Sequence, residues 1–213
     1  MGYYTILNEG KGKFDEKKSV FLSYAKRVFT EEEAKSFINE IKVHNKNARH
    51  NVYAYALGEK MNVQRYSDDG EPQGTGGIPV LGVIKKNEVT DIVVVVTRYF
   101  GGILLGIGGL TRAYCKAASL SIDASKIVER VMGLKLEIIT NYELLGKLQY
   151  LFTQNYWHIE NIEYTDRIKI SMFCQLDMLE IIKNIINETT SGNTNFQQDE
   201  EKLYFKSEKR LFL

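Results

Sequence analysis

Residues 92–123 read IVVVVTRYFGGILLGIGGLTRAYCKAASLSID and contain three patterns in succession. Ile92 to Val96 are β-branched apolar residues without alternation, which is typical of a strand covered on both faces. The glycines that follow are Gly101, Gly102, Gly106, Gly108 and Gly109. From Leu110 to Leu120 the spacing of apolar residues predicts a helix. We therefore expect a buried strand, a glycine turn and a helix.

The charge of this segment points to an anion site. No Asp or Glu lies between Asp91 and Asp123, whereas Arg98, Arg112 and Lys116 do. A glycine turn before a helix presents backbone N–H groups to a negatively charged ligand. Arg112 is expected in the first helical turn, where the helix dipole disfavours a cation by up to roughly 1 kcal/mol unless an anion binds. Two other interpretations stay open: the glycines only allow close packing, or the arginines pair with distant acids.

Composition narrows the class of protein. The chain has 213 residues, with 44% apolar and 26% charged content, which is typical of globular domains rather than disordered chains. No apolar run reaches the roughly 18 residues of a membrane-spanning helix. The N-terminus matches neither a signal peptide nor a myristoylation site. We expect a cytoplasmic protein that does not contact membranes, with Cys115 and Cys174 as free thiols.

Charge and periodicity divide the chain in two. Residues 1–130 carry 19 Lys and Arg against 15 Asp and Glu, whereas residues 131–213 carry 9 against 12. The second part shows the order strand, helix, strand, strand, helix, strand, which is ferredoxin-like. We predict an α+β protein with two domains, 1–131 and 132–213.

The expected elements of each domain follow from local patterns. In the first domain we expect a hairpin over residues 11–27 and a helix that is capped by Thr30 and ends near residues 44–47. We then expect strands over residues 52–57 and 62–66 and a helix that begins at Gly77. In the second we expect strands over 134–140, 157–164 and 167–176, helices capped by Asn141 and Asp177, and a final strand within 195–206.

An acidic loop precedes the central strand. Asp68, Asp69 and Glu71 lie within residues 67–77, which are dense in turn formers. Three carboxylates could hold a hard cation, but the spacing of a calcium loop is absent. Solvated acids, or acids paired with Arg98 and Arg112, explain the cluster more simply. We therefore predict neither a metal nor a cofactor.

Motifs for nucleophilic catalysis are weak. His50, expected in a loop between a helix and a strand, suits an acid or base but also a plain loop residue. Cys115 and Ser67 lack a recognisable nucleophile turn and a neighbouring base. The glycine turn is neither a Walker loop nor a Rossmann fingerprint. A Gly-x-Gly-Gly turn of another type that holds a nucleotide stays open.

Two long motifs carry a family resemblance. They are SDDGEPQGT at residues 67–75 and TRYFGGILLGIGGLTRAY at residues 97–114, with shorter matches at residues 17–21 and 48–51. Together they resemble the YigZ/IMPACT family. Val20 replaces a basic residue often seen in that family. Val52 replaces a common cysteine, which argues against a thiol mechanism at that position.

The resemblance implies a fold more clearly than an activity. It implies an N-terminal ribosomal-protein-type α/β sandwich and a C-terminal domain similar to the last domain of elongation factor G. The eukaryotic member regulates translation by binding an activator of a translation-factor kinase. It carries an additional domain not found in these residues, so we do not expect that partner here. Some bacterial members are labelled proline peptidases, but no metal cluster supports this activity.

The leading hypothesis is a non-catalytic regulator of translation or stress response that binds RNA, the ribosome or a translation-associated protein. Its surface would comprise His50, Arg98, Tyr99, Gly101, Gly102, Gly106, Gly108, Gly109, Arg112 and Lys116. The alternative is an enzyme that binds a phosphorylated or anionic small molecule at residues 106–110, with the acidic loop as base or metal ligand. A third hypothesis is a protein-interaction module.

Overall fold

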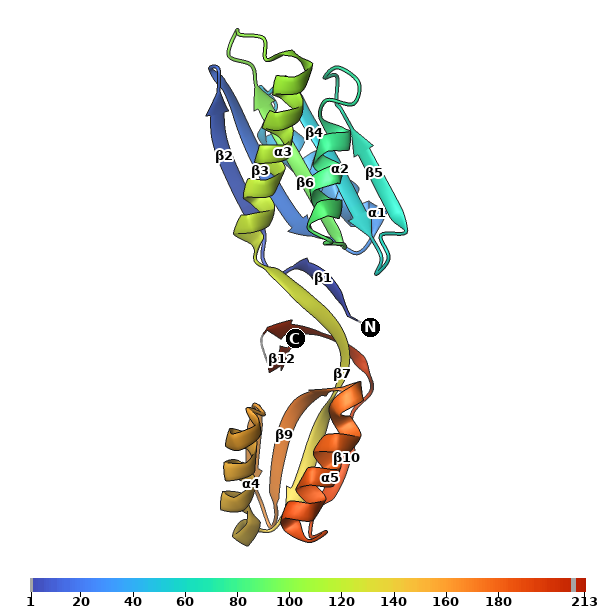
Figure 1. Cartoon of the computed structure of the whole chain (residues 1–213), viewed down its shortest axis with the longest axis vertical. Coiled ribbons are helices and arrows are strands. Elements are labelled where there is room, and N and C mark those ends of the chain that lie inside the picture. Colours follow the sequence, from blue (N-terminus) through green and yellow to red (C-terminus); the bar gives the residue numbers. More distant parts are fainter. Residues whose placement is uncertain (1, 208–209) are drawn as a thin grey trace. The chain divides into compact units, whose positions relative to one another are not determined.

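The computed structural model describes residues 2–207 and 210–213. Its described part forms two compact units, Tyr3–Val128 and Glu129–Leu213, each with a hydrophobic core of its own. Figure 1 shows the elements of both units. Each unit is described by itself.

The N-terminal unit is a five-stranded antiparallel sheet in the order β2-β3-β6-β4-β5. Its strands and helices are β1 (Tyr3–Ile6), β2 (Gly10–Glu16), β3 (Ser19–Arg27), α1 (Glu31–His44), β4 (His50–Leu57), β5 (Val63–Ser67), α2 (Gly77–Lys86), β6 (Ile92–Tyr99) and α3 (Gly106–Ser125). The strand β1 lies outside this sheet.

The central strand β6 is covered on both faces, as its sequence predicts. Seven of its eight residues are buried. Val94 and Val96 pack in the core beneath α2 and α3, whereas Val93 and Val95 pack with α1 on the opposite face. The unbroken apolar run is therefore explained by helices on both sides of the sheet.

The helix α3 begins four residues earlier than expected. Gly106, Gly108 and Gly109 belong to its first turn, and the loop before it is confined to residues 100–105. Arg112 lies in the second turn, so the expectation that it occupies the first is wrong. Similarly, His50 begins β4 rather than lying in a loop. Glycine is required at Gly106 because its φ of +69° is rarely adopted by other residues.

Close approach holds α3 against the sheet. A Cβ atom at Gly10 of β2 would lie 1.9 Å from the Ser121 carbonyl oxygen of α3. Small buried residues, Ala113, Ala117 and Ala118, line the facing side of the helix. The helix backbone therefore lies nearer to the sheet than larger side chains would allow.

The C-terminal unit has the ferredoxin-like topology that its sequence predicts. Its elements are β7 (Ile127–Thr140), α4 (Tyr142–Asn155), β8 (Asn161–Tyr164), β9 (Ile168–Gln175), η1 (Leu176–Met178), α5 (Leu179–Thr190), β10 (Asn195–Gln198), β11 (Lys202–Ser207) and β12 (Arg210–Phe212). Four strands pair antiparallel in the order β10-β7-β9-β8. The strand β11 pairs with both β7 and β12.

Several boundaries in this unit differ from expectation. The first strand begins at Ile127 rather than Leu134. The range 195–206, expected to contain one final strand, holds β10 and most of β11, and β12 follows it. Asp177 lies in the 3-10 turn η1, and α5 begins after Met178, so Asp177 does not cap it. Asn141 does occupy the N-cap of α4, but its side chain makes no capping hydrogen bond.

Two glycine substitutions test the packing of α3. Gly10→Ala should lower the free energy of unfolding by about 1–3 kcal/mol, because the added methyl group meets the α3 backbone. Gly82→Ala is the matched control, since a Cβ atom there meets nothing within 4 Å. It should raise stability by up to about 1 kcal/mol through helix propensity. Urea unfolding measures both, and equal effects would contradict the close approach.

Candidate functional site

The loop of residues 100–105 is packed against the turn between β2 and β3. A Cβ atom at Gly101 would lie 1.9 Å from the Lys18 carbonyl oxygen, so the two segments touch through their backbones. Gly102 is exposed and has a φ of +84°, a conformation that favours glycine. These two glycines therefore shape the loop and bring the turn beside the start of α3.

The N-terminus of α3 is open. Its N-cap residue Leu105 makes no side-chain capping hydrogen bond, and its first turn contains no acidic residue. Gly106 and Gly108 are exposed. The first N–H groups of any helix lack intrahelical partners. The site therefore offers the donors and the positive end of a helix dipole that an anion requires.

Three cations lie beside the first three turns of α3. Lys17, Arg112 and Lys116 line a hollow of about 250 Å³ together with Phe14 and Glu16. The Lys116 ammonium lies 4.8 Å from the centre of the Phe14 ring. Arg112 Nη1 lies 3.4 Å from where a Cβ atom of Gly108 would be, so the guanidinium reaches over the first turn.

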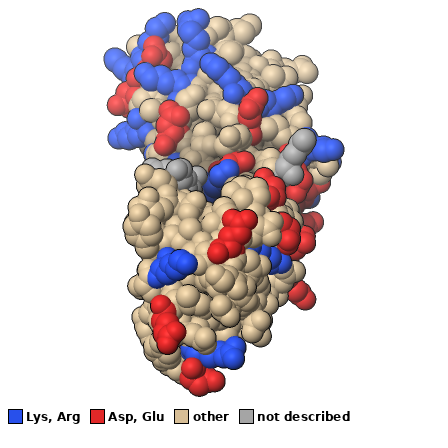
Figure 2. All heavy atoms as spheres, turned by 60° about the horizontal axis from the view of Figure 1, so that its bottom comes forward, with Lys and Arg blue, Asp and Glu red and all other residues tan. Residues whose placement is uncertain are grey.

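We call this surface, formed by Lys17, Gly106, Gly108, Arg112 and Lys116, the basic end. Within residues 2–207 and 210–213, none of its three cations makes an ion pair. Figure 2 shows that Lys and Arg side chains on the face in view lie mainly on the N-terminal unit. With Glu16 as the one acid in the lining of this hollow, the three cations leave the basic end with an excess of positive charge.

An apolar tip accompanies these cations. Ile103, Leu104 and Ile107 are 41%, 83% and 72% exposed, although aliphatic side chains of this size usually gain by burial. Their signal in the sequence was the run Ile103 to Leu105 between glycines, which we interpreted only as part of a turn. Contiguous exposed apolar residues indicate a surface that a partner covers.

Arg98 lies beneath the surface, apart from the basic end. Its side chain is 5% exposed, and Arg98 Nη1 donates a hydrogen bond of 2.7 Å to Glu71 Oε1. The Tyr114 hydroxyl donates to the same oxygen at 2.9 Å. Burial, together with the Glu71 carboxylate, raises the pKa of Tyr114, so its hydroxyl stays a donor. Arg98 is therefore paired with an acid that is distant in the sequence, Glu71, which is one of the two interpretations left open above.

His50 and Tyr99 also make internal contacts. His50 is 9% exposed; its Nδ1 lies 2.8 Å from the Asp69 carbonyl oxygen and its Nε2 lies 3.9 Å from Glu71 Oε1. The Tyr99 hydroxyl donates to Asn45 Oδ1 at 2.9 Å. Ser19, which sequence reasoning missed, lies 3.4 Å from Arg98 Nη2. The quoted motifs thus converge on a buried polar cluster around Arg98 and Glu71.

The acidic loop is used within the fold. Asp68 accepts N–H groups of Gly74, Gly76 and Gly77 at 2.8–2.9 Å, which fixes the start of α2. Although burial acts to raise it, the pKa of Asp68 is lowered by these hydrogen bonds. Asp69 accepts from Lys42 Nζ and from the Asn51 amide, each at 2.7 Å. In the described part of the chain, no group of three or more His, Cys, Asp and Glu is arranged to hold a metal.

The candidate nucleophiles are poorly placed. Cys115 is half-buried, and burial raises its pKa. Burial raises the pKa of Cys174 to about 11, so its thiol stays protonated at neutral pH. Ser67 Oγ accepts the Asp69 N–H at 3.1 Å.

Among the residues that the structure describes, no helix has the length and hydropathy to span a membrane.

Removing the Glu71 carboxylate tests the buried cluster. Glu71→Ala should lower the free energy of unfolding by about 3–5 kcal/mol, because Arg98 is left buried without its counter-charge. Glu9→Ala is the matched control: the side chains of Glu9 and its partner Lys26 are 52% and 37% exposed, and the loss should be at most about 1 kcal/mol. Denaturant unfolding of both variants gives the comparison, and similar losses would show that the Arg98 pair contributes no more than a surface contact.

Comparisons with known proteins match this architecture. The Impact N-terminal domain model matches residues 17–122, and a domain of unknown function, DUF1949, matches residues 138–193. The chain is 36% identical to the IMPACT family member YvyE of Bacillus subtilis over 198 residues, covering 93% of this chain and 91% of that protein. It is 40% identical to the Protein IMPACT homolog of Dictyostelium discoideum over 96 residues, covering 43% of this chain and 27% of that one.

A solved structure shows the same fold. The crystal structure of a hypothetical protein superposes with a TM-score of 0.59 at 24% identity, covering 94% of this chain and 98% of that one. The resemblance noted in the motifs is confirmed by the relative that spans nearly the whole chain. With its two domains matched in order, this chain belongs to the IMPACT family.

Proposed function

We propose that the protein is a non-catalytic regulator of translation that docks on the ribosome through the basic end. The observation that carries this proposal is the set of unpaired cations, Lys17, Arg112 and Lys116, around an open helix N-terminus. Phosphate groups are the anions that such a surface prefers. The translational role that the family resemblance implies for the eukaryotic member supports the same conclusion.

The apolar tip favours a ribonucleoprotein over RNA alone. Single-stranded RNA is recognised largely by stacking on aromatic side chains, whereas the exposed residues here are aliphatic. Ile103, Leu104 and Ile107 suit an apolar protein surface, while the cations suit phosphates. A ribosome offers both kinds of surface in close proximity.

Two finer fold assignments belong to this proposal. We infer that the N-terminal unit is a sandwich of the ribosomal-protein type and that the C-terminal unit is similar to the last domain of elongation factor G. The ferredoxin-like strand order of the C-terminal unit supports the second assignment. Each acid of the loop is already engaged by a contact among the described residues, which is why we favour the regulator over the enzyme alternative.

Sedimentation of the full-length protein with ribosomes tests the proposal. If the three cations contact phosphates, affinity should fall by about 20-fold to 40-fold between 50 and 200 mM salt, given a slope of about 0.7–0.9 per phosphate contact. Arg112→Glu with Lys116→Glu should weaken binding and flatten this slope. Leu104→Ser should weaken binding without changing the slope, because it removes no charge.

The matched control replaces two lysines outside the basic end with glutamates. Lys85→Glu with Lys86→Glu changes the net charge equally, but these residues lie in the last turn of α2. This variant should sediment like the unaltered protein. No sedimentation at 50 mM salt, or an equal loss in the control, would contradict docking through the basic end.

A further inference from the structure

The C-terminal unit contains a hollow of about 440 Å³ that has no part in the function proposed above. It lies where the end of α4, the strand β9, the start of α5 and the strands β11 and β12 meet. Its walls include the apolar side chains Trp157, Met172, Cys174, Met178, Ile182 and Leu211. Its volume and its apolar walls are typical of small-molecule sites.

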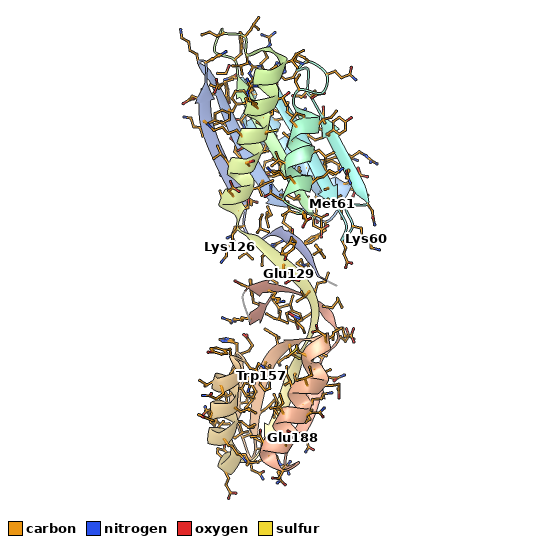
Figure 3. All side chains as sticks on the ribbon, in the orientation of Figure 1. Lys60, Met61, Lys126, Glu129, Trp157 and Glu188 are labelled. Carbon is orange, nitrogen blue, oxygen red and sulfur yellow. The ribbon has the colours of Figure 1, made fainter. Side chains whose placement is uncertain are left out.

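The wall formed by Trp157 is held in place by the fold. Tyr156 ends α4 in the left-handed conformation, with a φ of 56°. The chain then turns back, so that the Trp157 N–H donates to the Phe152 carbonyl oxygen at 2.9 Å. The Phe152 and Trp157 rings meet edge to face, and their centres lie 5.6 Å apart. Figure 3 labels Trp157 at this end of α4. The hollow is therefore formed before any ligand arrives.

The floor of the hollow is apolar. Met172 and Cys174 of β9 are 2% and 4% exposed, and Ile182 of α5 is buried beside them. Because its thiol stays protonated, Cys174 adds no charge to this floor. A polar molecule would lose hydrogen bonds to water there without replacing them. The deep part of the hollow therefore suits a hydrocarbon chain or an aromatic ring.

The mouth of the hollow is polar, and two of the residues that line it, Lys206 and Arg210, are permanent cations. Arg210 Nη2 lies 3.2 Å from Glu160 Oε2, and His158 Nε2 lies 3.6 Å from Glu160 Oε1. Lys206 also lines the hollow, but its partner Glu129 does not. Each of these two cations thus has one carboxylate partner, and each carries more N–H donors than that contact uses. An anionic head group would accept hydrogen bonds from the remaining donors.

We propose that this hollow binds a small amphipathic anion: a carboxylate with a medium-length aliphatic chain or an aromatic ring, its apolar part against Trp157 and its head group at Arg210 and Lys206. Arg210 is half exposed, so its guanidinium can contact a head group while keeping Glu160. The site is separate from the basic end, and its occupancy is independent of ribosome docking.

Fluorescence of the full-length protein tests the proposal directly, because Trp157 is the only tryptophan in the chain. Sodium decanoate serves as the probe, with decanol and decyltrimethylammonium as neutral and cationic comparators. Decanoate should change the emission saturably and bind roughly tenfold more tightly than either comparator, the scale of one charge-assisted hydrogen bond. No saturable change with decanoate would overturn the proposal, and equal binding of decanol would overturn its anionic part.

Three variants locate the binding. Met178→Phe enlarges a side chain that lines the hollow and should weaken decanoate binding, whereas Ile181→Phe enlarges an exposed neighbour outside the lining and should not. Arg210→Gln, at an exposed side chain, should weaken decanoate binding roughly tenfold and leave decanol unaffected. Equal affinities for decanoate in the Met178 and Ile181 variants would place the probe elsewhere and contradict the assignment.

Discussion

The ion pair between Arg98 and Glu71 links the central strand to the acidic loop, and Tyr114 of α3 joins it through the same carboxylate oxygen. In the interior, such a pair is kept only when its geometry and hydrogen bonds are good, because losing one partner leaves a buried charge. The pair therefore fixes where the acidic loop lies.

The character of the basic end follows from this arrangement. Asp68 is committed to the start of α2, and Asp69 to Lys42 and the backbone of β4. The acids of the loop are thus engaged internally, while Arg112 and Lys116 share their hollow with a single acid, Glu16. That combination is unfavourable in isolation, since like charges that line one hollow repel each other. It is relieved when an anion binds, which is why we place the function at this surface.

Much of the fold could be predicted from the sequence, because the spacing of apolar residues along the chain indicates which segments form strands and helices. The unbroken run Ile92 to Val96 indicated a strand buried on both faces, and the alternation from Ile168 to Cys174 indicated a half-buried one. The start of α3 could not be predicted, because glycine has weak helix propensity and Gly106 to Gly109 resemble a turn. The partner of Arg98 could not be predicted either, since Glu71 lies 27 residues away and only tertiary structure joins them. Arg98 is paired with an acid, as one interpretation expected, whereas Arg112 makes no ion pair within the described residues, and its part in an anion site stays a prediction.

Hydrogen exchange of the protein bound to ribosomes tests the central claim most directly. The amides of Gly106, Ile107 and Gly108 lie in the first turn of α3, where helical N–H groups lack intrahelical partners and exchange quickly. If phosphates dock at the basic end, these amides should exchange more slowly in the complex than in the free protein, together with those of the turn at Lys17. Unchanged exchange at these amides, with protection confined to other segments of the bound protein, would contradict the account.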